Sequence, residues 1–404
     1  MTTHEMGTGP RAINKNAQRS QRQRNRRRHE ATQLAIIAVA VALVGLFAYA
    51  IVNGLEQKGI RFSFSFLWNF AGFDISEGKI LAIGENYMPT FTAFTADRSI
   101  AEAFMAGIFN TIKVAVLAIV LSTVLGTLLG VGRLSTNWII RTLSFWIVEF
   151  VRNTPLLIQL VFWYFAVVLH FPPIAAAARL YGGVIISQQG LYLPTLAWQG
   201  GESMLALVLL TATSVAILGA FFDPARRTRR LCIATALALF CIMLFSGTVT
   251  VDYPVASRFR ASGGTALSPE MAALLLAIVV NSASYIAEIV RGAIDALPKG
   301  QWEAASSLGL NRRNTVNDII LPQVFRVVLP SFGNQYISLT KNTALGIAIG
   351  YPDLFNIYGT IANQTGHSLE GILIVMVSYL ILSWIISALV SWASNRLNTS
   401  GAMR

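Results

Sequence analysis

Between two long apolar stretches the chain reads LPKGQWEAASSLG at residues 297–309 and continues to IILPQ at 319–323. The first part is predicted to form a short helix outside the apolar stretches. Glu303 is expected in its first turn, where the helix dipole favours an acid. Gly309 permits the positive φ that ends a helix, and Asn311 is able to cap the next one. The sequence therefore predicts a compact helical loop at one surface of an apolar helical body.

The short helix carries apolar side chains that have no reason to face water. Trp302, Leu308 and Leu310 would be costly to leave exposed, so they are expected to fit a groove of a partner protein. Ala304 and Ala305 are small enough to let another surface approach closely. The loop is therefore predicted to be a docking element.

The composition outside this loop excludes an ordinary soluble domain. Of the 404 residues, 54% are hydrophobic and only 12% are charged, about half the charged share of soluble proteins. So few charges cannot cover the surface of a soluble protein of this size. Two cysteines also exclude a disulfide-stabilised secreted domain. The predicted fold class is all-α, a polytopic helical membrane protein.

Eight apolar runs are long enough, or nearly so, to cross a bilayer, for which a helix needs about 20 residues. The third run is short, and the amphipathic, basic segment 138–152 before it is expected to lie at the cytoplasmic interface. The seventh is expected to begin at Pro330. The eight spans are predicted at roughly 33–53, 104–131, 155–170, 204–222, 231–248, 269–290, 330–350 and 372–392.

The distribution of Lys and Arg predicts the orientation. With the N-terminus inside, the cytoplasmic segments hold 22 Lys and Arg residues and the outside segments hold seven. Because cytoplasmic loops carry the excess of basic residues, both termini are predicted to be cytoplasmic. The net charge of +12 and the basic run at residues 22–28 then indicate a positive-inside anchor and not a nucleic-acid site, since no aromatic platform accompanies the run.

Sequence motifs for catalysis are missing. The chain has no phosphate-binding G-x-x-x-x-G-K-[ST] motif and no H-E-x-x-H zinc motif, and its four histidines are scattered. No cluster of a nucleophile and a base suggests an enzyme, so no catalytic and no metal-binding residue is predicted. Only Glu288 is an acid placed well inside a span. These observations favour a transporter that is powered from outside this chain.

The loop resembles the coupling segment of ABC importer permeases. In that family the motif is Glu-Ala-Ala, three residues, Gly, nine residues, Ile-x-Leu-Pro, and the segment docks into a cleft of the ATP-hydrolysing subunit. The resemblance implies a type I importer permease core and assigns ATP and Mg²⁺ to partner subunits, with no cofactor on this chain. The residues expected to couple to the ATPase, within 297–322, are Trp302, Glu303, Ala304, Ala305, Leu308, Gly309, Leu321 and Pro322.

Other stretches resemble the polar amino acid branch of these permeases. They are FVRNTPLLIQL at 150–160, SYIAEIVRG at 284–292 and LTKNTAL at 339–345. Within the first, Arg152, Thr154 and Pro155 are expected to form a structural corner, and Asn153 stands where many relatives carry Gly. The chain length, the stretch AGFDI at 71–75 and an insertion at 171–268 resemble the large permease subunit of the general L-amino acid importer.

A substrate path is predicted from polar residues at helical spacing, because residues spaced in this way share one face of a helix. The resemblance adds the Lys-Asn-Thr segment at 341–343. The predicted path residues are Asn281, Tyr285, Glu288, Asn334, Ser338, Lys341, Asn342 and Thr343.

Two charges on this path suit a zwitterionic amino acid. Lys341 is able to pair with its carboxylate and Glu288 with its ammonium group. An intramembrane charge needs a partner or water, so two alternatives stay open. Glu288 would instead pair with Arg291 or Arg152, and Lys341 would form an ion pair between helices or subunits.

The domain organisation follows from these assignments. Residues 104–170 and 269–395 are expected to form the permease core in two parts, and the pair of spans in 171–268 preserves the orientation of the coupling segment. The remaining parts are a basic tail at 1–32, an extra helix with a periplasmic loop at 33–103 and a cytoplasmic tail at 396–404.

The sequence predicts a permease subunit of an ATP-driven importer for polar L-amino acids such as glutamate, glutamine, aspartate and asparagine, in the inner membrane. Expected partners are a second homologous permease in a heterodimer, two ATP-binding subunits, a periplasmic amino-acid-binding protein and the lipid bilayer, with no nucleic acid. The alternatives are an ion-coupled secondary transporter, which the complete coupling segment and the lack of an inverted repeat disfavour, and a membrane enzyme.

Overall fold

The computed structural model describes residues 31–54 (except 44, 48, 51 and 52), 63–83, 89–198, 231–238 (except 233 and 236), 249–311 and 314–402. The chain divides into two units, Met1–Ser65 and Phe66–Arg404. The first unit contains the apolar helix Ala31–Phe47, which overlaps the first expected span. The expected span 204–222 and two-thirds of the expected span 231–248 lie outside the described residues.

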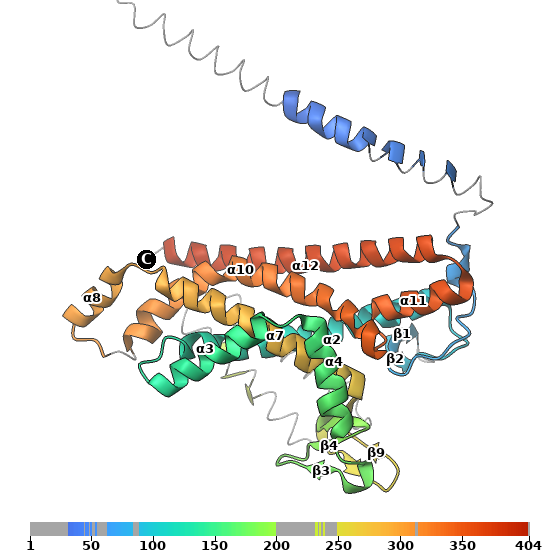
Figure 1. Cartoon of the computed structure of the whole chain (residues 1–404), viewed down its shortest axis with the longest axis horizontal. Coiled ribbons are helices and arrows are strands. Elements are labelled where there is room, and N and C mark those ends of the chain that lie inside the picture. Colours follow the sequence, from blue (N-terminus) through green and yellow to red (C-terminus); the bar gives the residue numbers. More distant parts are fainter. Residues whose placement is uncertain are drawn as a thin grey trace, which may run out of the picture. The chain divides into compact units, whose positions relative to one another are not determined.

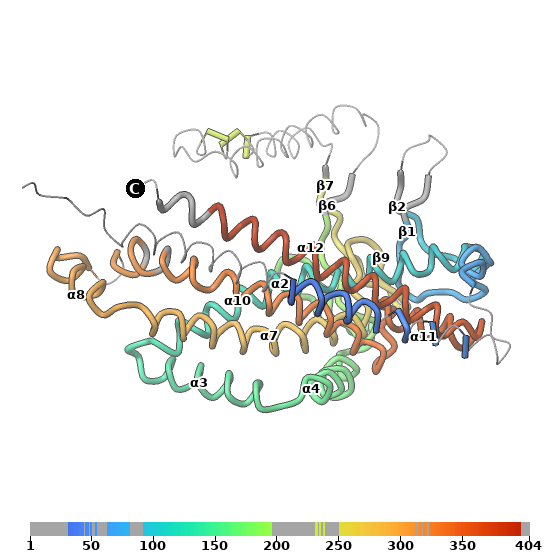
Figure 2. The backbone as a smooth tube through the Cα atoms, turned by 90° about the horizontal axis from the view of Figure 1, so that it is seen from above, coloured from blue at the N-terminus to red at the C-terminus, as the bar shows by residue number. Residues whose placement is uncertain are grey.

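Four long helices form the body of the second unit: α2 (Ile100–Gly132), α7 (Pro269–Asp295), α10 (Leu321–Asn342) and α12 (Ser368–Ala402). They lie side by side in Figures 1 and 2, with α2 against α7 and with α10 against both α7 and α12. Within the described part of the chain, α2, α7 and α12 are long and apolar enough to cross a bilayer. The expected spans 104–131, 269–290 and 372–392 fall inside these three helices, and the predicted helical class is confirmed.

Capping residues set where α2 and α7 begin. The Ser99 hydroxyl accepts a hydrogen bond from the Glu102 backbone N–H at 3.2 Å, and the Glu102 carboxylate accepts one from the Ser99 N–H at 2.8 Å. This reciprocal capping box satisfies two N–H groups that have no partner inside the helix. α7 begins after Ser268, whose hydroxyl accepts from the Met271 N–H at 3.1 Å, and Pro269 follows in the first turn.

Glycines of α2 allow it to pack closely on α7. A Cβ atom at Gly126 would lie 2.6 Å from Cβ of Ile286, and one at Gly130 would lie 2.7 Å from the carbonyl oxygen of Ala287. Small residues at such contacts let two helix backbones approach within a membrane. Gly126 and Gly130 therefore serve close packing of α2 on α7.

The Gly126→Ala variant should therefore be destabilised, because the added methyl group must push the α7 backbone and Ile286 aside. We expect a loss of roughly 1–3 kcal/mol, as for other overpacked cores, measured as a lower thermal unfolding midpoint in detergent. Gly292→Ala is the matched control on α7, since nothing lies within 4 Å of a Cβ atom there. Equal midpoints for the two variants would contradict the close contact.

A bent helix pair follows α2. The helix α3 (Trp138–Arg152) and the helical segment Leu156–His170 meet at an angle of 103°. Pro155 at the bend lacks an N–H group and disfavours helical backbone at Thr154. The expected third span, 155–170, is helical over Leu156–His170. Its first part is α4 (Leu156–Phe162), followed by the π turn η2 (Trp163–Val167) and the 3₁₀ turn η3 (Val168–His170).

The start of the seventh expected span, 330–350, was wrong, because the helix begins before Pro330. α10 begins at Leu321, contains Pro330 and ends at Asn342. The 3₁₀ helix η6 (Thr343–Ile349) follows it directly. Pro322 is tolerated in the first turn because the N–H groups there have no acceptor within the helix. Gly350 ends η6 with φ 79°, a left-handed conformation that suits glycine.

Short strands, which are absent from the all-α prediction, occupy the segments between the helices. In Figure 1 the strands β3, β4 and β9 lie beyond the end of α4. The sheets are β1–β2, β10–β5–β4–β3, β6–β7 and β8–β9, all antiparallel. The remaining elements are η1 (Ser65–Trp68), β1 (Lys79–Ile83), β2 (Pro89–Ala93), η4 (Ile174–Ala176), β3 (Ala178–Arg179), β4 (Ile185–Ser187), β5 (Gly190–Leu193), β6 (Thr195–Trp198), β7 (Val249–Asp252), β8 (Val255–Ala256), β9 (Ala261–Ser262), β10 (Thr265–Leu267), α8 (Lys299–Ser307), η5 (Thr315–Ile320) and α11 (Leu354–Thr365).

Candidate functional site

The loop 297–309 folds into the short helix α8. Gly309 follows it with φ 69°, and the Leu310 N–H donates to the Ala305 carbonyl at 3.1 Å, so Gly309 ends the helix as predicted. The Asn311 side chain accepts from the Asn314 N–H at 2.8 Å, which is the expected cap. Glu303 lies in the second turn of α8, not in the first, because the helix already begins at Lys299.

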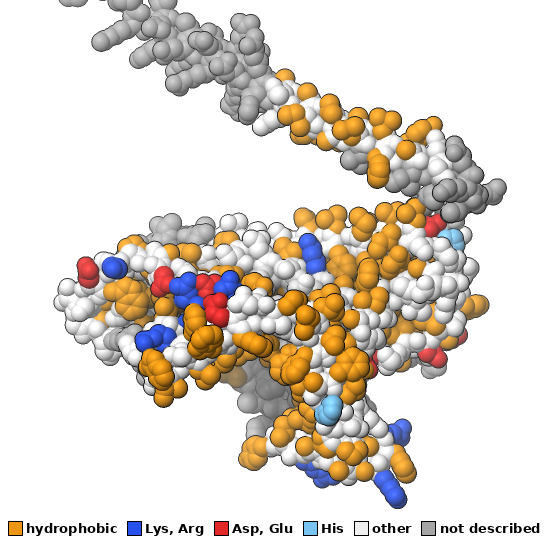
Figure 3. All heavy atoms as spheres, viewed as in Figure 1, with side chains coloured by type: hydrophobic (Ala, Val, Ile, Leu, Met, Phe, Trp, Pro, Cys, Tyr) orange, Lys and Arg blue, Asp and Glu red, His pale blue; other side chains and the backbone are white. Residues whose placement is uncertain are grey.

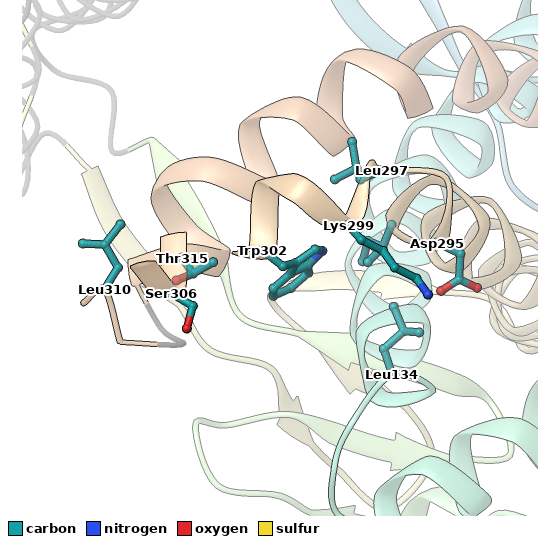
Figure 4. A pocket seen from close by; sticks show the side chains of 9 residues that line it. Leu134, Asp295, Leu297, Lys299, Trp302, Ser306, Leu310 and Thr315 are labelled. Carbon is teal, nitrogen blue, oxygen red and sulfur yellow. The ribbon is translucent and has the colours of Figure 1, made fainter. Parts of the chain in front are cut away.

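The apolar side chains of this loop divide into two groups. Leu308 is 77% exposed and Leu310 is 37% exposed, as a docking surface requires. Trp302 is half-buried against the core cluster that includes Val290 and Val324. In Figure 4 it lies beside a cavity, whose volume is about 660 Å³. Ala304 is exposed and Ala305 is buried. The side chains of Leu321 and Pro322 lie outside the described residues.

The cavity beside Trp302 separates α8 from the ends of α2 and α7. Its lining is both apolar and charged, and Asp295 and Lys299 face it in Figure 4. The lining residues are Leu134, Ile294, Asp295, Leu297, Lys299, Trp302, Ser306, Leu310 and Thr315.

A second cavity, of about 510 Å³, collects several of the predicted path residues. It lies between the α3–α4 corner and the two helices α7 and α10, and most of its lining is polar. The lining residues are Arg152, Asn153, Thr154, Pro155, Leu156, Asn281, Tyr285, Gln335, Ser338, Asn342 and Leu345.

The structure separates the predicted path residues into two sets. Asn281, Tyr285, Ser338 and Asn342 line this polar cavity. The other four do not line it: Asn334 and Lys341 are exposed, Thr343 is buried, and Glu288 joins an ion-pair cluster. The Thr343 hydroxyl donates to the Thr340 carbonyl at 2.8 Å.

The α3–α4 corner, expected to be structural only, supplies part of the cavity wall. The Gln159 side chain donates to the carbonyls of Val151 and Thr154 at 2.8 and 2.9 Å, which holds the corner in shape. Arg152 lines the cavity with its guanidinium 5.8 Å from the ring centroid of Tyr285. Its buried Nε atom has no hydrogen-bond partner among the described residues. The sequence signal for this second role was the polar run of Arg, Asn and Thr before Pro155.

Glu288 is surrounded by arginines. Its carboxylate accepts from Arg133 Nη1 and from Arg291 Nη2, both at 2.5 Å, and Arg152 Nη1 lies 3.7 Å away. Arg133 is only 8% exposed in its side chain and also faces Glu149 at 3.4 Å. The alternative that Glu288 pairs with Arg291 or Arg152 is therefore present in the structure. Together with Arg133, these ion pairs join the end of α2 to α3 and α7.

The opposite ends of the helices hold a buried polar group. The Asn110 side chain on α2 donates to the carbonyls of Glu77 and Pro352, at 2.6 and 2.8 Å. Asp353 is fully buried, accepts from the Asn356 N–H at 2.9 Å and caps α11. Burial raises the pKa of the Asp353 carboxyl to about 6, because a charged carboxylate is poorly solvated there.

Protonation of Asp353 should make the stability pH-dependent. Its native pKa of about 6 exceeds the unperturbed 3.8, so its contribution is full below pH 3.8 and is lost as the pH rises through 6. The loss amounts to ~3 kcal/mol. Asp353→Asn keeps the helix cap without a charge, so its thermal unfolding midpoint should fall less between pH 4.5 and 7.5. Asp97→Asn, at a fully exposed carboxyl, is the control. If the unfolding midpoints of Asp353→Asn and wild type change with pH in the same way, the raised pKa of Asp353 is contradicted.

Within the described part of the chain, no group of three His, Cys, Asp or Glu side chains is arranged to hold a metal ion. The charged and polar groups are instead paired with one another or line the two cavities.

Comparison with known proteins gives consistent matches. The family described as binding-protein-dependent transport system inner membrane component matches residues 122–400. The chain is 36% identical to the putative amino-acid ABC transporter permease protein YhdX of Escherichia coli (strain K12), over 90% of this chain and 92% of that protein. It is 33% identical to the general L-amino acid transport system permease protein AapQ of Rhizobium johnstonii, over 90% and 91%. It is 32% identical to the glutamate/glutamine/aspartate/asparagine transport system permease protein BztB of Rhodobacter capsulatus, over 89% and 91%.

Proposed function

The chain belongs to the family of binding-protein-dependent transport system inner membrane components, and from this we propose that it is a permease subunit of an ATP-driven importer for polar L-amino acids. The observation that carries the proposal is the similarity to three amino-acid permeases over about nine-tenths of the chain. The chain is a transporter component and not an enzyme. The names of AapQ and BztB favour a broad set of substrates that includes glutamate, glutamine, aspartate and asparagine.

The proposed assembly contains a second, homologous permease, two ATP-binding subunits and a periplasmic amino-acid-binding protein. ATP and Mg²⁺ are bound by the ATP-binding subunits. The coupling segment, residues 297–322, faces the cytoplasm and docks onto one of them through the exposed Leu308 and Leu310. Both termini are cytoplasmic in this arrangement.

The polar cavity is the proposed passage for the substrate. Asn281, Tyr285, Ser338 and Asn342 provide hydrogen-bonding groups, and Arg152 provides a cation inside the lining. A free amino acid needs a cation for its carboxylate, and an arginine binds a carboxylate in bidentate geometry. Lys341 is the second candidate, because it is adjacent in sequence to the lining residue Asn342 and is exposed.

The energy source is tested with the whole complex in proteoliposomes. All ion gradients are collapsed, ATP is supplied on the side of the membrane where the ATP-binding subunits lie, and the loaded binding protein is supplied on the other side. Transport of glutamate and glutamine toward the ATP side should continue. Uptake that stops on collapse of the gradients, and that does not need ATP, would establish an ion-coupled transporter instead.

Two variants test which cation receives the substrate carboxylate. Arg152→Gln should lower ATP-driven uptake by about tenfold or more, since a charge-assisted contact contributes about 1.5–3 kcal/mol. Lys341→Met should then leave uptake within about twofold of wild type. The reverse result assigns the carboxylate to Lys341. Wild-type uptake by both variants, at equal levels of assembled complex, would contradict the proposed passage.

A further inference from the structure

A third cavity, of about 330 Å³, lies beside the ion-pair cluster at the end of the helices that carries the coupling segment. Figure 3 shows basic and acidic side chains gathered at this end, among apolar ones. The cavity lies where the end of α2 meets α3 and α7. Its lining residues are Arg133, Leu134, Arg141, Thr142, Phe145 and Arg291.

The lining of this cavity is strongly basic. Three of its six residues are arginines, and no carboxylate lines it. The surrounding cluster contains three carboxylates and four arginines, and its net charge is therefore +1. The arginines are Arg133, Arg141, Arg152 and Arg291. The carboxylates are Glu149, Glu288 and Asp295. The cavity therefore favours an anion.

Hydrogen-bond donors remain available for such an anion. A guanidinium carries five N–H donors. Arg133 uses two contacts, to Glu288 and Glu149, and Arg291 uses three, to Glu288 and Asp295. Arg141 makes one hydrogen bond, to the Ser135 carbonyl at 3.3 Å, and no ion pair within the described residues. Arg141 is thus the arginine whose charge is least compensated.

The surface next to the cavity is apolar. α3 exposes Trp138, Ile139, Leu143 and Trp146, each at 60% or more. A helix with basic residues beside such a face lies in the interface of a bilayer, where tryptophan is enriched. An anion that enters this cavity would therefore have its apolar part beside these side chains.

We infer that the cavity binds the phosphate of an anionic phospholipid, with Arg133, Arg141 and Arg291 around the phosphate and the acyl chains along α3. Basic pockets between membrane helices bind lipid head groups by this chemistry. With the proposed orientation, this lipid belongs to the cytoplasmic leaflet of the membrane. The binding site itself does not depend on that orientation. A bound lipid would stabilise the contacts between α2, α3 and α7 next to the coupling segment.

Native mass spectrometry of the purified complex tests this inference. Phosphatidylglycerol and phosphatidylcholine are titrated onto delipidated wild type, Arg141→Gln and Arg326→Gln. Arg326 is an exposed arginine of α10 outside the cavity, so its variant removes the same charge elsewhere. Wild type should prefer phosphatidylglycerol, and Arg141→Gln should weaken the first binding event about tenfold, whereas Arg326→Gln should match wild type.

Three results would overturn the inference. They are equal binding of the two lipids by wild type, unchanged binding by Arg141→Gln, and an equal loss in Arg326→Gln. Inorganic phosphate is added in a separate titration to distinguish the source of the anion. Displacement of phosphatidylglycerol by millimolar phosphate, dependent on Arg141, would assign the cavity to free phosphate and would also reject the lipid.

Discussion

Gly309→Val should abolish at least nine-tenths of ATP-driven uptake while the protein remains folded in the membrane. Gly309 adopts φ 69° at the end of α8, a conformation that costs a β-branched residue about 1–2 kcal/mol or more. The strain is relieved if the turn changes, and the exposed Leu308 and Leu310 would then leave the positions at which they are proposed to contact the ATP-binding subunit. ATP hydrolysis should continue in the variant without a matching uptake of amino acid.

Gly300 gives the matched control for this experiment. It lies in the first turn of the same helix, has no positive φ, and nothing lies within 4 Å of a Cβ atom there. Gly300→Val therefore adds the same side chain to α8 without strain at the turn. The ratio of uptake to ATP hydrolysis is measured for both variants. A Gly309→Val complex that couples as well as Gly300→Val would show that the turn does not transmit energy.

Glu288→Gln should lower the stability of the subunit by roughly 2–4 kcal/mol. Glu288 accepts hydrogen bonds from Arg133 and Arg291 and also lies near Arg152, so its removal leaves a nearly buried Arg133 with Glu149 alone. Leaving a buried charge without its partner is among the most destabilising single changes. The fall is measured as a lower thermal unfolding midpoint and a reduced yield of purified protein.

Two further variants separate this effect from a general loss of charge. Asp295 pairs with Arg291 at the edge of the cluster and is 49% exposed, so Asp295→Asn should cost less than about 1 kcal/mol. The double variant Arg133→Gln with Glu288→Gln should be more stable than the sum of the two single losses predicts, because their charges interact. Additive losses would show that the two side chains do not act as a pair.

The helical core was accessible from the sequence because apolar length alone identifies a spanning helix. α2, α7 and α12 each contain a long apolar run. Pro330 was misleading: it was taken as a helix start, although helix α10 runs through it from Leu321. The pairings β10–β5 and β6–β7 could not be predicted because they join segments far apart in the chain, as in the pairing of Leu191 with Leu267.

The candidate site was predicted in part. Helical spacing placed Asn281 and Tyr285 on one face and Ser338 on another, and the structure gathers all three around one cavity. Spacing gave no information about Arg152, because its entry into the cavity depends on the 103° bend that follows it. The same limit applies to Glu288, whose partner Arg133 lies on another helix and 155 residues away.

The pairing of β6 with β7 brings two points of the chain that are distant in sequence together in the fold. Trp198 pairs with Val249, so the 50 residues between these two positions leave and rejoin the described fold at one place. Segments with adjacent ends are gained, lost or exchanged at little cost to the scaffold, since no core contact depends on the distance between the ends. An insertion, deletion or exchange between Trp198 and Val249 is therefore expected to leave helices α7, α8 and α10 in place.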